Sequence, residues 1–146
     1  MQFIYCDGGR KDAGFAKTRA RDCVTRAVCI ITRQSYKDVH DFFTESSLRQ
    51  RKSKKAKIIN NADDGIYTTR KWFKDYPTSL GYKWTPTMLV GQGCKVHLVD
   101  GELPMGRLIV SVSRHYTAVI DGVIFDIGDP QRGEKRCVYG YWSKST

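Results

Sequence analysis

Three side chains have the types and the chain order that nucleophilic thiol chemistry requires. Cys23 stands where a helix should begin, and His115 and Asp126 stand on either side of an Asp-Gly dipeptide. A thiol in the first turn of a helix lies at the positive end of the helix dipole. A nearby imidazole can accept the thiol proton and later protonate a leaving group, while a carboxylate fixes the tautomer of that imidazole. The pattern therefore predicts Cys23 as nucleophile, His115 as base and Asp126 as orienter.

The Asp-Gly dipeptide at residues 121–122 predicts how the base and the orienter meet. Asp-Gly between two runs of β-branched and aromatic residues is typical of a two-residue type I′ hairpin. Counting outward from this turn pairs Thr117 with Asp126 and places His115 on the same face of the hairpin. Diagonal neighbours on one face are close enough for a hydrogen bond between the His115 ring and Asp126.

Two of these assignments have alternatives. Asp129 falls on the opposite face of a regular strand, but the turn at residues 128–130 could redirect it, so Asp129 is the runner-up orienter. Asp126 could instead cap the strand end or pair with Arg114. Without a catalytic role, Cys23 would be a small buried hydrophobe.

The cysteines form no regular framework. Because there are five of them without C-x-x-C spacing, neither a complete disulfide set nor a four-thiolate zinc site is predicted, and at least one thiol should be free. Cys29 and Cys137 are expected to be small buried hydrophobes. A metal site would have to combine Cys94 and His97 with a distant Cys or His. Half of a zinc motif is a weak signal, so we predict no metal site and no cofactor.

The N-terminal half of the sequence predicts helices. Apolar residues at 24, 27, 28 and 31 recur at helical spacing after Asp22, a suitable N-cap, so Cys23 should lie in the first turn. A capping pattern at Ser35 predicts a second helix to about residue 48. A third is expected over residues 68–76 and should end at Pro77. The first 21 residues, rich in Gly and charge, are predicted to form an irregular arm.

The C-terminal half predicts strands separated by Gly, Asp or Pro. These strands are expected at residues 88–90, 96–98, 108–112, 116–120, 123–127 and 137–142. The fold class that follows is α+β. Residues 1–146 would form a single domain in which N-terminal helices pack on a C-terminal antiparallel sheet of about five or six strands.

Length and charge limit the possible functions. The chain has 146 residues, enough for one core and one site. No apolar run is long enough to span a bilayer, and the start lacks the basic and apolar segments of a secretory signal, so we expect a cytoplasmic protein without membrane contact. Lys and Arg number 25 against 15 Asp and Glu, a formal charge of +10 that favours acidic proteins or nucleic acid as partners.

The densest part of this charge predicts an alternative function. A basic run could bind nucleic acid or an acidic protein in a non-catalytic role, through Arg49, Arg51, Lys52, Lys54, Lys55 and Lys57. No aromatic residues are interleaved with these basic residues, so stacking on bases is not expected there. A solvated face is therefore the preferred explanation of the run.

Several short motifs, taken together, resemble an uncharacterised family of phage and bacterial proteins. They stand at residues 22–27, 36–39, 80–88, 103–110 and 113–130, and so extend over nearly the whole chain. More distantly, a helix-borne Cys followed by a His-led strand and an Asp resembles the layout of papain-like and bacteriocin-processing (C39-like) cysteine peptidases.

The resemblance implies a papain-like fold in a phage or bacterial host, with Cys23 as nucleophile and His115 as base. The implied activity is a peptidase or amidase that acts on a peptide or other acyl substrate through an acyl-enzyme. Peptidases that end in Asp-Pro would favour Asp129 as the acid. Their oxyanion donor is usually a Gln shortly before the Cys, which this chain lacks. An oxyanion hole would therefore need the Cys23 amide with a second donor, such as Thr18 or the backbone of the Gly14 loop.

Overall fold

Helices and strands segregate along the chain in a computed structural model that describes residues 1–15, 22–49, 68–133 and 135–144. The helices of these residues are α1 (Cys23–Thr32), α2 (Tyr36–Arg49) and α3 (Lys71–Ser79). The strands are β1 (Gln2–Tyr5), β2 (Tyr82–Pro86), β3 (Arg107–Val112), β4 (His115–Ile120), β5 (Val123–Asp126) and β6 (Val138–Lys144). The described residues thus form the expected α+β class. None of their helices is both long and apolar enough to cross a membrane.

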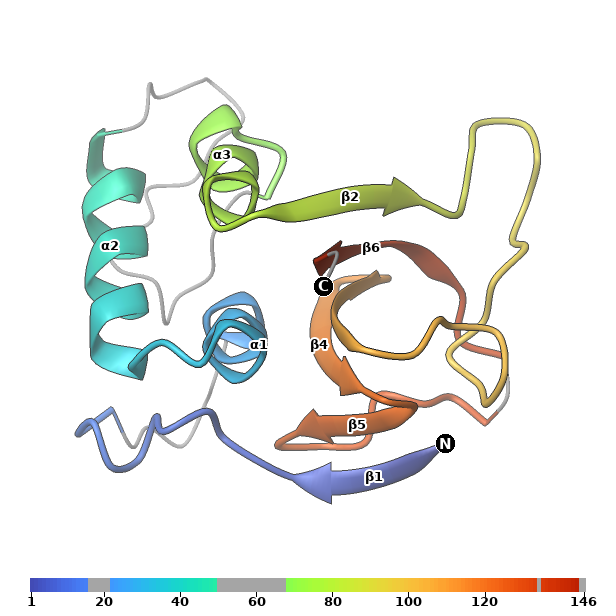
Figure 1. Cartoon of the computed structure of the whole chain (residues 1–146), viewed down its shortest axis with the longest axis horizontal. Coiled ribbons are helices and arrows are strands. Elements are labelled where there is room, and N and C mark those ends of the chain that lie inside the picture. The colour runs from blue at the N-terminus through green and yellow to red at the C-terminus, as the bar shows by residue number, and fades with distance from the viewer. Residues whose placement is uncertain (16–21, 50–67, 134, 145–146) are drawn as a thin grey trace.

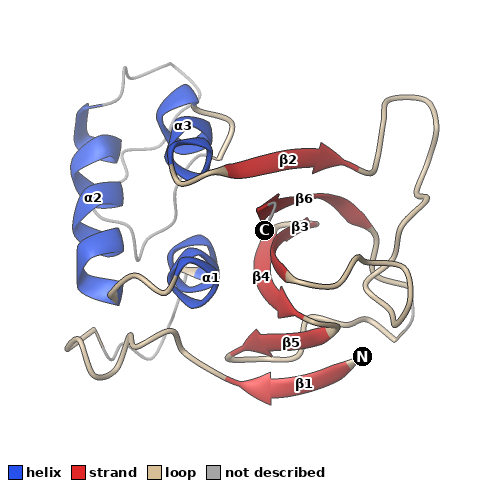
Figure 2. Ribbon diagram, in the orientation of Figure 1, coloured by secondary structure: helices blue, strands red, loops and turns tan. Residues whose placement is uncertain are grey.

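The sheet is mixed, whereas an antiparallel sheet was predicted. Its six strands follow the order β1-β5-β4-β3-β6-β2, and β1 pairs with β5 in parallel while the other neighbours are antiparallel (Figure 2). The parallel pair arises because residues 2–5, expected in the irregular arm, form an edge strand alongside the end of the last hairpin. β1 therefore lies directly beside Asp126.

The predicted type I′ hairpin is confirmed. Asp121 and Gly122 have φ angles of 49° and 79°, the left-handed conformations that both central residues of this turn need. Ile120 then pairs with Val123, and Ala118 pairs with Phe125, in the register counted from the sequence. This register places the start of β4 beside the end of β5.

The sheet separates two apolar clusters. The helices cover one face, where α1 packs on β3, β4 and β5 and buries Ile109 and Ala118 of the sheet (Figure 1). The other face is covered by loop residues such as Leu98 and by Phe3 of β1. β3 alternates between the two clusters and is buried on both faces, which makes it the centre of the fold.

α1 is anchored to the sheet at its C-terminal end. Arg33 ends the helix in the left-handed conformation, at φ 63°. The Arg107 guanidinium of β3 donates hydrogen bonds to the backbone carbonyls of Ile30 and Ile31, with Nε 2.9 Å from the Ile31 oxygen. A cation on the last helical carbonyls also complements the helix dipole. The orientation of α1, and so of Cys23, is fixed against β3.

Three other predicted elements were placed wrongly. Residues 88–90 form no strand: Thr87 and Met88 both donate to the Tyr139 carbonyl, after which the chain turns into an exposed loop. The preceding residues 82–86 form β2 instead. Of the strand expected at 96–98, His97 makes an isolated bridge to Cys137. Pro77 lies inside α3 rather than at its end.

Cys94 and Cys137 form a disulfide, and Cys137 is half-buried, so it is not the small buried hydrophobe that was predicted. The backbone bridge between His97 and Cys137 brings the two segments together. Cys29 is buried as expected. The free thiols of the described residues are Cys6, Cys23 and Cys29.

Gly140 of β6 gives a test of this packing. A Cβ there would lie 2.3 Å from Cζ2 of Trp84 and 2.9 Å from the Thr85 carbonyl oxygen. Gly140→Ala should lower the free energy of unfolding in urea by about 1–3 kcal/mol because the close β2–β6 contact must open. Gly128→Ala is the control, since its Cβ would meet nothing within 4 Å. Equal stability of the two variants would contradict the β2–β6 register.

Candidate active site

Cys23 is the first residue of α1 and lines a cleft of about 920 Å³. Its side chain is half-buried, so the sulfur is reachable from the cleft without being fully solvated. The cleft is bounded by the start of α1, the β3–β4 turn and the loop that follows β5. His115, Asp126 and Asp129 line the same cleft.

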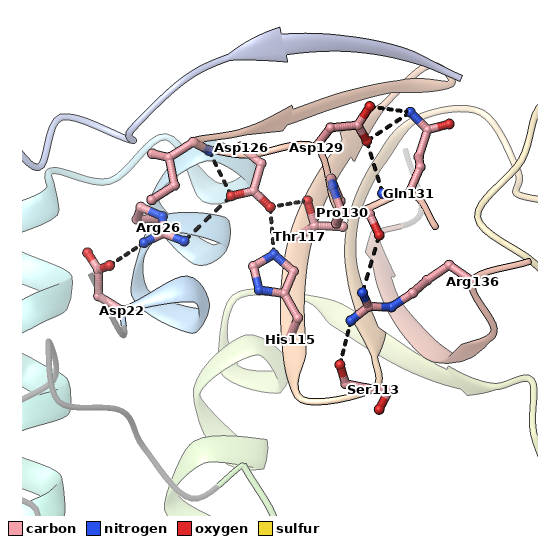
Figure 3. A network of polar contacts seen from close by, with 11 residues as sticks. Asp22, Arg26, Ser113, His115, Thr117, Asp126, Asp129, Pro130, Gln131 and Arg136 are labelled. Atoms are coloured by element: carbon pink, nitrogen blue, oxygen red, sulfur yellow. Dashed lines mark hydrogen bonds and ion pairs between the residues drawn. The ribbon is translucent and has the colours of Figure 1, made fainter. Parts of the chain in front are cut away.

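His115 links the cysteine to the predicted orienter. As the first residue of β4, it places Nε2 2.7 Å from Oδ2 of Asp126, and the Thr117 hydroxyl donates to the same oxygen at 2.8 Å (Figure 3). Cys23 lines the same cleft and lies near enough to the His115 ring to raise its pKa. Because Nε2 faces Asp126, Nδ1 is the ring nitrogen left for the thiol. The structure thus brings Cys23, His115 and Asp126 together in that order.

Charge around His115 favours its protonated form. Burial by itself would lower the pKa of the ring, but hydrogen bonds and negative charge from Asp126 and Cys23 outweigh burial and raise the pKa of His115 to about 9. Burial likewise opposes ionisation of Asp126, yet the hydrogen bond and charge of His115 hold the pKa of that carboxyl below its usual range. The pair is therefore held as imidazolium and carboxylate at neutral pH.

Asp126 is almost fully buried, and all its described contacts stabilise negative charge. Oδ1 accepts the Ile127 backbone N–H at 2.8 Å and lies 3.5 Å from Nη2 of Arg26. Oδ2 accepts hydrogen bonds from the His115 ring and the Thr117 hydroxyl. A carboxylate with donors on both oxygens cannot rotate freely, which fixes the orientation of the His115 ring.

Arg26 extends this network to Asp22. The Arg26 guanidinium pairs with Asp22, one turn earlier on the chain, while its other amino group faces Asp126 (Figure 3). Asp22 also accepts the Tyr36 hydroxyl at 2.6 Å and lies 3.1 Å from Nε of Arg10. Both carboxylates are thus buried against positive partners.

Because Asp22 pairs with Arg26, its side chain does not cap α1. Asp22 occupies the N-cap position, but its side chain makes no capping hydrogen bond there. The backbone N–H groups of Cys23 and Val24 therefore receive no side-chain cap from it, and both residues line the cleft. The first turn of α1 thus borders the cleft without a side-chain cap from Asp22.

The remaining predicted site residues lie apart from this network or outside the described residues. Asp129 is exposed, and its carboxylate accepts the Gln131 backbone N–H at 2.9 Å and the Gln131 side-chain amide at 3.0 Å. Arg49 is exposed and pairs with Glu45 on α2. The other predicted residues lie outside the described residues, namely Thr18, Arg51, Lys52, Lys54, Lys55 and Lys57.

The other cysteines have different environments from that of Cys23. Burial, together with the charge of Asp22, raises the pKa of Cys29 to about 12. Cys94 is in a disulfide, and although its sulfur lies 3.6 Å from Nε2 of His97, the described part of the chain has no group of three side chains that could hold a metal ion.

Sequence reasoning missed the central position of Arg26. Its pairing with Asp22 was recognisable from their spacing of four residues on one helix. Its contact with Asp126 spans 100 positions and has no local signature. Arg10 was likewise missed, because it belongs to a Gly-rich segment without periodicity.

Comparisons with models of protein families, with curated proteins and with solved structures found no match to this chain. The resemblance to papain-like peptidases therefore stays a prediction from the sequence motifs.

The raised pKa of His115 makes stability depend on pH. Because folding favours the protonated ring, its contribution is complete below the unfolded pKa of 6.5 and is lost as pH rises to about 9. Urea unfolding of the native protein and His115→Gln should show a stability difference that shrinks across this interval, by at most about 3 kcal/mol. A constant difference would mean that the ring is not held as imidazolium.

Arg26→Met tests the buried network. Removing the guanidinium leaves Asp22 and Asp126 buried without it, and we expect a loss of about 3–5 kcal/mol in urea unfolding. Lys37→Met is the matched control, since Lys37 also pairs with an Asp four residues away, but on the exposed face of α2. We expect this variant to unfold at nearly the native urea concentration. Similar losses in both variants would contradict the central role of Arg26.

Proposed function

We propose that this protein is a papain-like cysteine hydrolase of peptide or other amide bonds, in which Cys23, His115 and Asp126 act as nucleophile, base and orienter. The observation that carries the proposal is the hydrogen bond of His115 to Asp126 in the cleft that Cys23 also lines, where Cys23 helps to raise the pKa of the His115 ring. The cleft supports it, because a substrate could reach the sulfur there. The chain order and the helix-borne cysteine agree with the papain-like layout.

In the first half of the reaction, Nδ1 of His115 holds the proton of the Cys23 thiol and the sulfur attacks the carbonyl carbon of the substrate. The carbonyl electron pair moves to oxygen and gives a tetrahedral oxyanion. When the oxyanion collapses, the carbon–nitrogen bond breaks and His115 gives its proton to the leaving amine. The product that remains on the enzyme is a Cys23 thioester.

In the second half, His115 takes a proton from a water molecule as that water attacks the thioester carbonyl. The carbon–sulfur bond then breaks, the acid product leaves, and the proton returns to the Cys23–His115 pair. Asp126 stays ionised throughout and stabilises the imidazolium, in agreement with the lowered pKa of its carboxyl.

The start of α1 supplies the oxyanion donor in this scheme. The backbone N–H of Cys23 belongs to the same residue as the nucleophile, and the Asp22 side chain does not cap the helix. An oxyanion formed next to the sulfur would meet this N–H and the positive helix end. The orientation of Asp22 toward Arg26 therefore serves catalysis as well as folding.

Alkylation by iodoacetamide tests the Cys23–His115 pair. We expect adduct mapping at pH 7 to find Cys23 labelled at least tenfold faster than Cys6, the other half-buried free thiol, and Cys29 unlabelled because it is buried. His115→Ala should remove most of the advantage of Cys23. Asp126→Asn should reduce it less, since the ring loses its orientation but remains present.

The internal control is Cys6, whose labelling rate should be the same in all three proteins. Equal rates at Cys6 and Cys23 in the native protein, or a Cys23 rate that does not respond to His115→Ala, would refute the proposed pair. Circular dichroism of each variant verifies that the fold is retained.

A further inference from the structure

One wall of the cleft is formed by arginines. Arg114 belongs to the β3–β4 turn, immediately before His115, and Arg132 and Arg136 belong to the segment between β5 and β6. All three line the same cleft as Cys23. Arg114 and Arg132 are exposed, whereas Arg136 is 8% exposed.

Few negative charges of the described residues lie in the cleft to neutralise these arginines. None of the ion pairs formed among the described residues involves Arg114, Arg132 or Arg136. Of the described carboxylates that line the cleft, Asp126 is engaged by His115 and Arg26, and Asp129 accepts hydrogen bonds from Gln131. The wall therefore carries an excess of positive charge next to the candidate nucleophile.

Arg136 is held rigidly at this wall. Its terminal amino groups donate to the carbonyl oxygens of Ser113, at 2.5 Å, and Pro130, at 3.3 Å, and so tie the β3–β4 turn to the loop after β5 (Figure 3). Its Nε is buried and has no hydrogen-bond partner among the described residues. Burial, and then the positive charge of Arg132, lower the pKa of Arg136 below its usual range. The two guanidinium groups thus repel each other, and no carboxylate of the described residues forms an ion pair with either of them.

We propose that this arginine wall binds a carboxylate of the substrate, so that the enzyme prefers acyl substrates with a carboxylate close to the bond that is cleaved. The proposal rests on the proposed function and names its substrate class. Exposed Arg132 and Arg114 would make the direct contacts, because a guanidinium matches the planar geometry of a carboxylate. Arg136 would act as a positioning residue that adds charge and holds the wall in place.

A carboxylate is the anion that the chemistry favours. Peptide substrates contain carboxylates in their acidic side chains and at their C-terminus. Binding such a group would relieve the repulsion between Arg132 and Arg136. The net charge of the protein, +10, would also steer an anionic substrate toward the cleft.

The test compares two alkylating agents of nearly equal size, anionic iodoacetate and neutral iodoacetamide. The measured quantity is the ratio of their rates at Cys23, determined by adduct mapping at low salt. Arg132→Gln should lower this ratio about three- to tenfold, since one nearby positive charge is removed. Lys83→Gln, the same charge change on exposed β2, should leave the ratio unchanged. In 1 M salt the difference between the native protein and Arg132→Gln should disappear.

The two proposals fail in different ways. An iodoacetamide rate that is the same at Cys6 and Cys23 refutes the catalytic pair. The arginine wall is refuted if iodoacetamide labels Cys23 faster than Cys6 as expected, but Arg132→Gln leaves the iodoacetate-to-iodoacetamide rate ratio at Cys23 unchanged. Competition at equal ionic strength identifies the anion: acetate should slow iodoacetate more than phosphate does, and the reverse order would overturn the carboxylate assignment.

Discussion

Arg26 makes the helices and the sheet of this protein depend on each other. Asp22 and Asp126 are both almost fully buried, and an isolated buried carboxylate would cost several kcal/mol. The Arg26 guanidinium contacts both of them, and it can do so only when the first turns of α1 lie against the end of β5. The same geometry puts Cys23 beside His115. Docking of α1 against β5 therefore both compensates the two buried carboxylates and brings Cys23 close to His115.

Burial and charge divide the site into two regions with different tasks. Inside the network, the positive charge of Arg26 and the donors around Asp126 keep that carboxylate ionised, which in turn favours a protonated His115. On the cleft side, the charge of Arg132 and Arg136 has no such partner among the described residues. Charge that is compensated inside the network orients His115, whereas charge without a partner among the described residues is available to a ligand.

Local patterns in the sequence predicted the parts of the fold that local chemistry decides. The helical spacing after Asp22 located α1, and Asp121-Gly122 located the hairpin and its register, so the contact between His115 and Asp126 followed from the sequence alone. β1 was missed because it is a short parallel edge strand whose partner lies far away in sequence. Residues 88–90 were predicted as a strand because they are apolar, yet pairing with β6 ends at Met88 and Val90 is fully exposed. The contact of Arg26 with Asp126 could not be predicted either, because no spacing rule connects a helix to a strand 100 residues later.

The distance in sequence between α1 and the β4–β5 hairpin also determines when the proposed site can form. During synthesis the segment with Cys23 leaves the ribosome well before His115 and Asp126 have been made. Until the hairpin closes and α1 docks on it, the sulfur has neither an imidazole nor a cleft beside it, and it behaves as an ordinary thiol. In the proposed mechanism, the reactivity of Cys23 toward amide bonds therefore emerges only with the finished tertiary structure, which would protect the growing chain and its neighbours from cleavage.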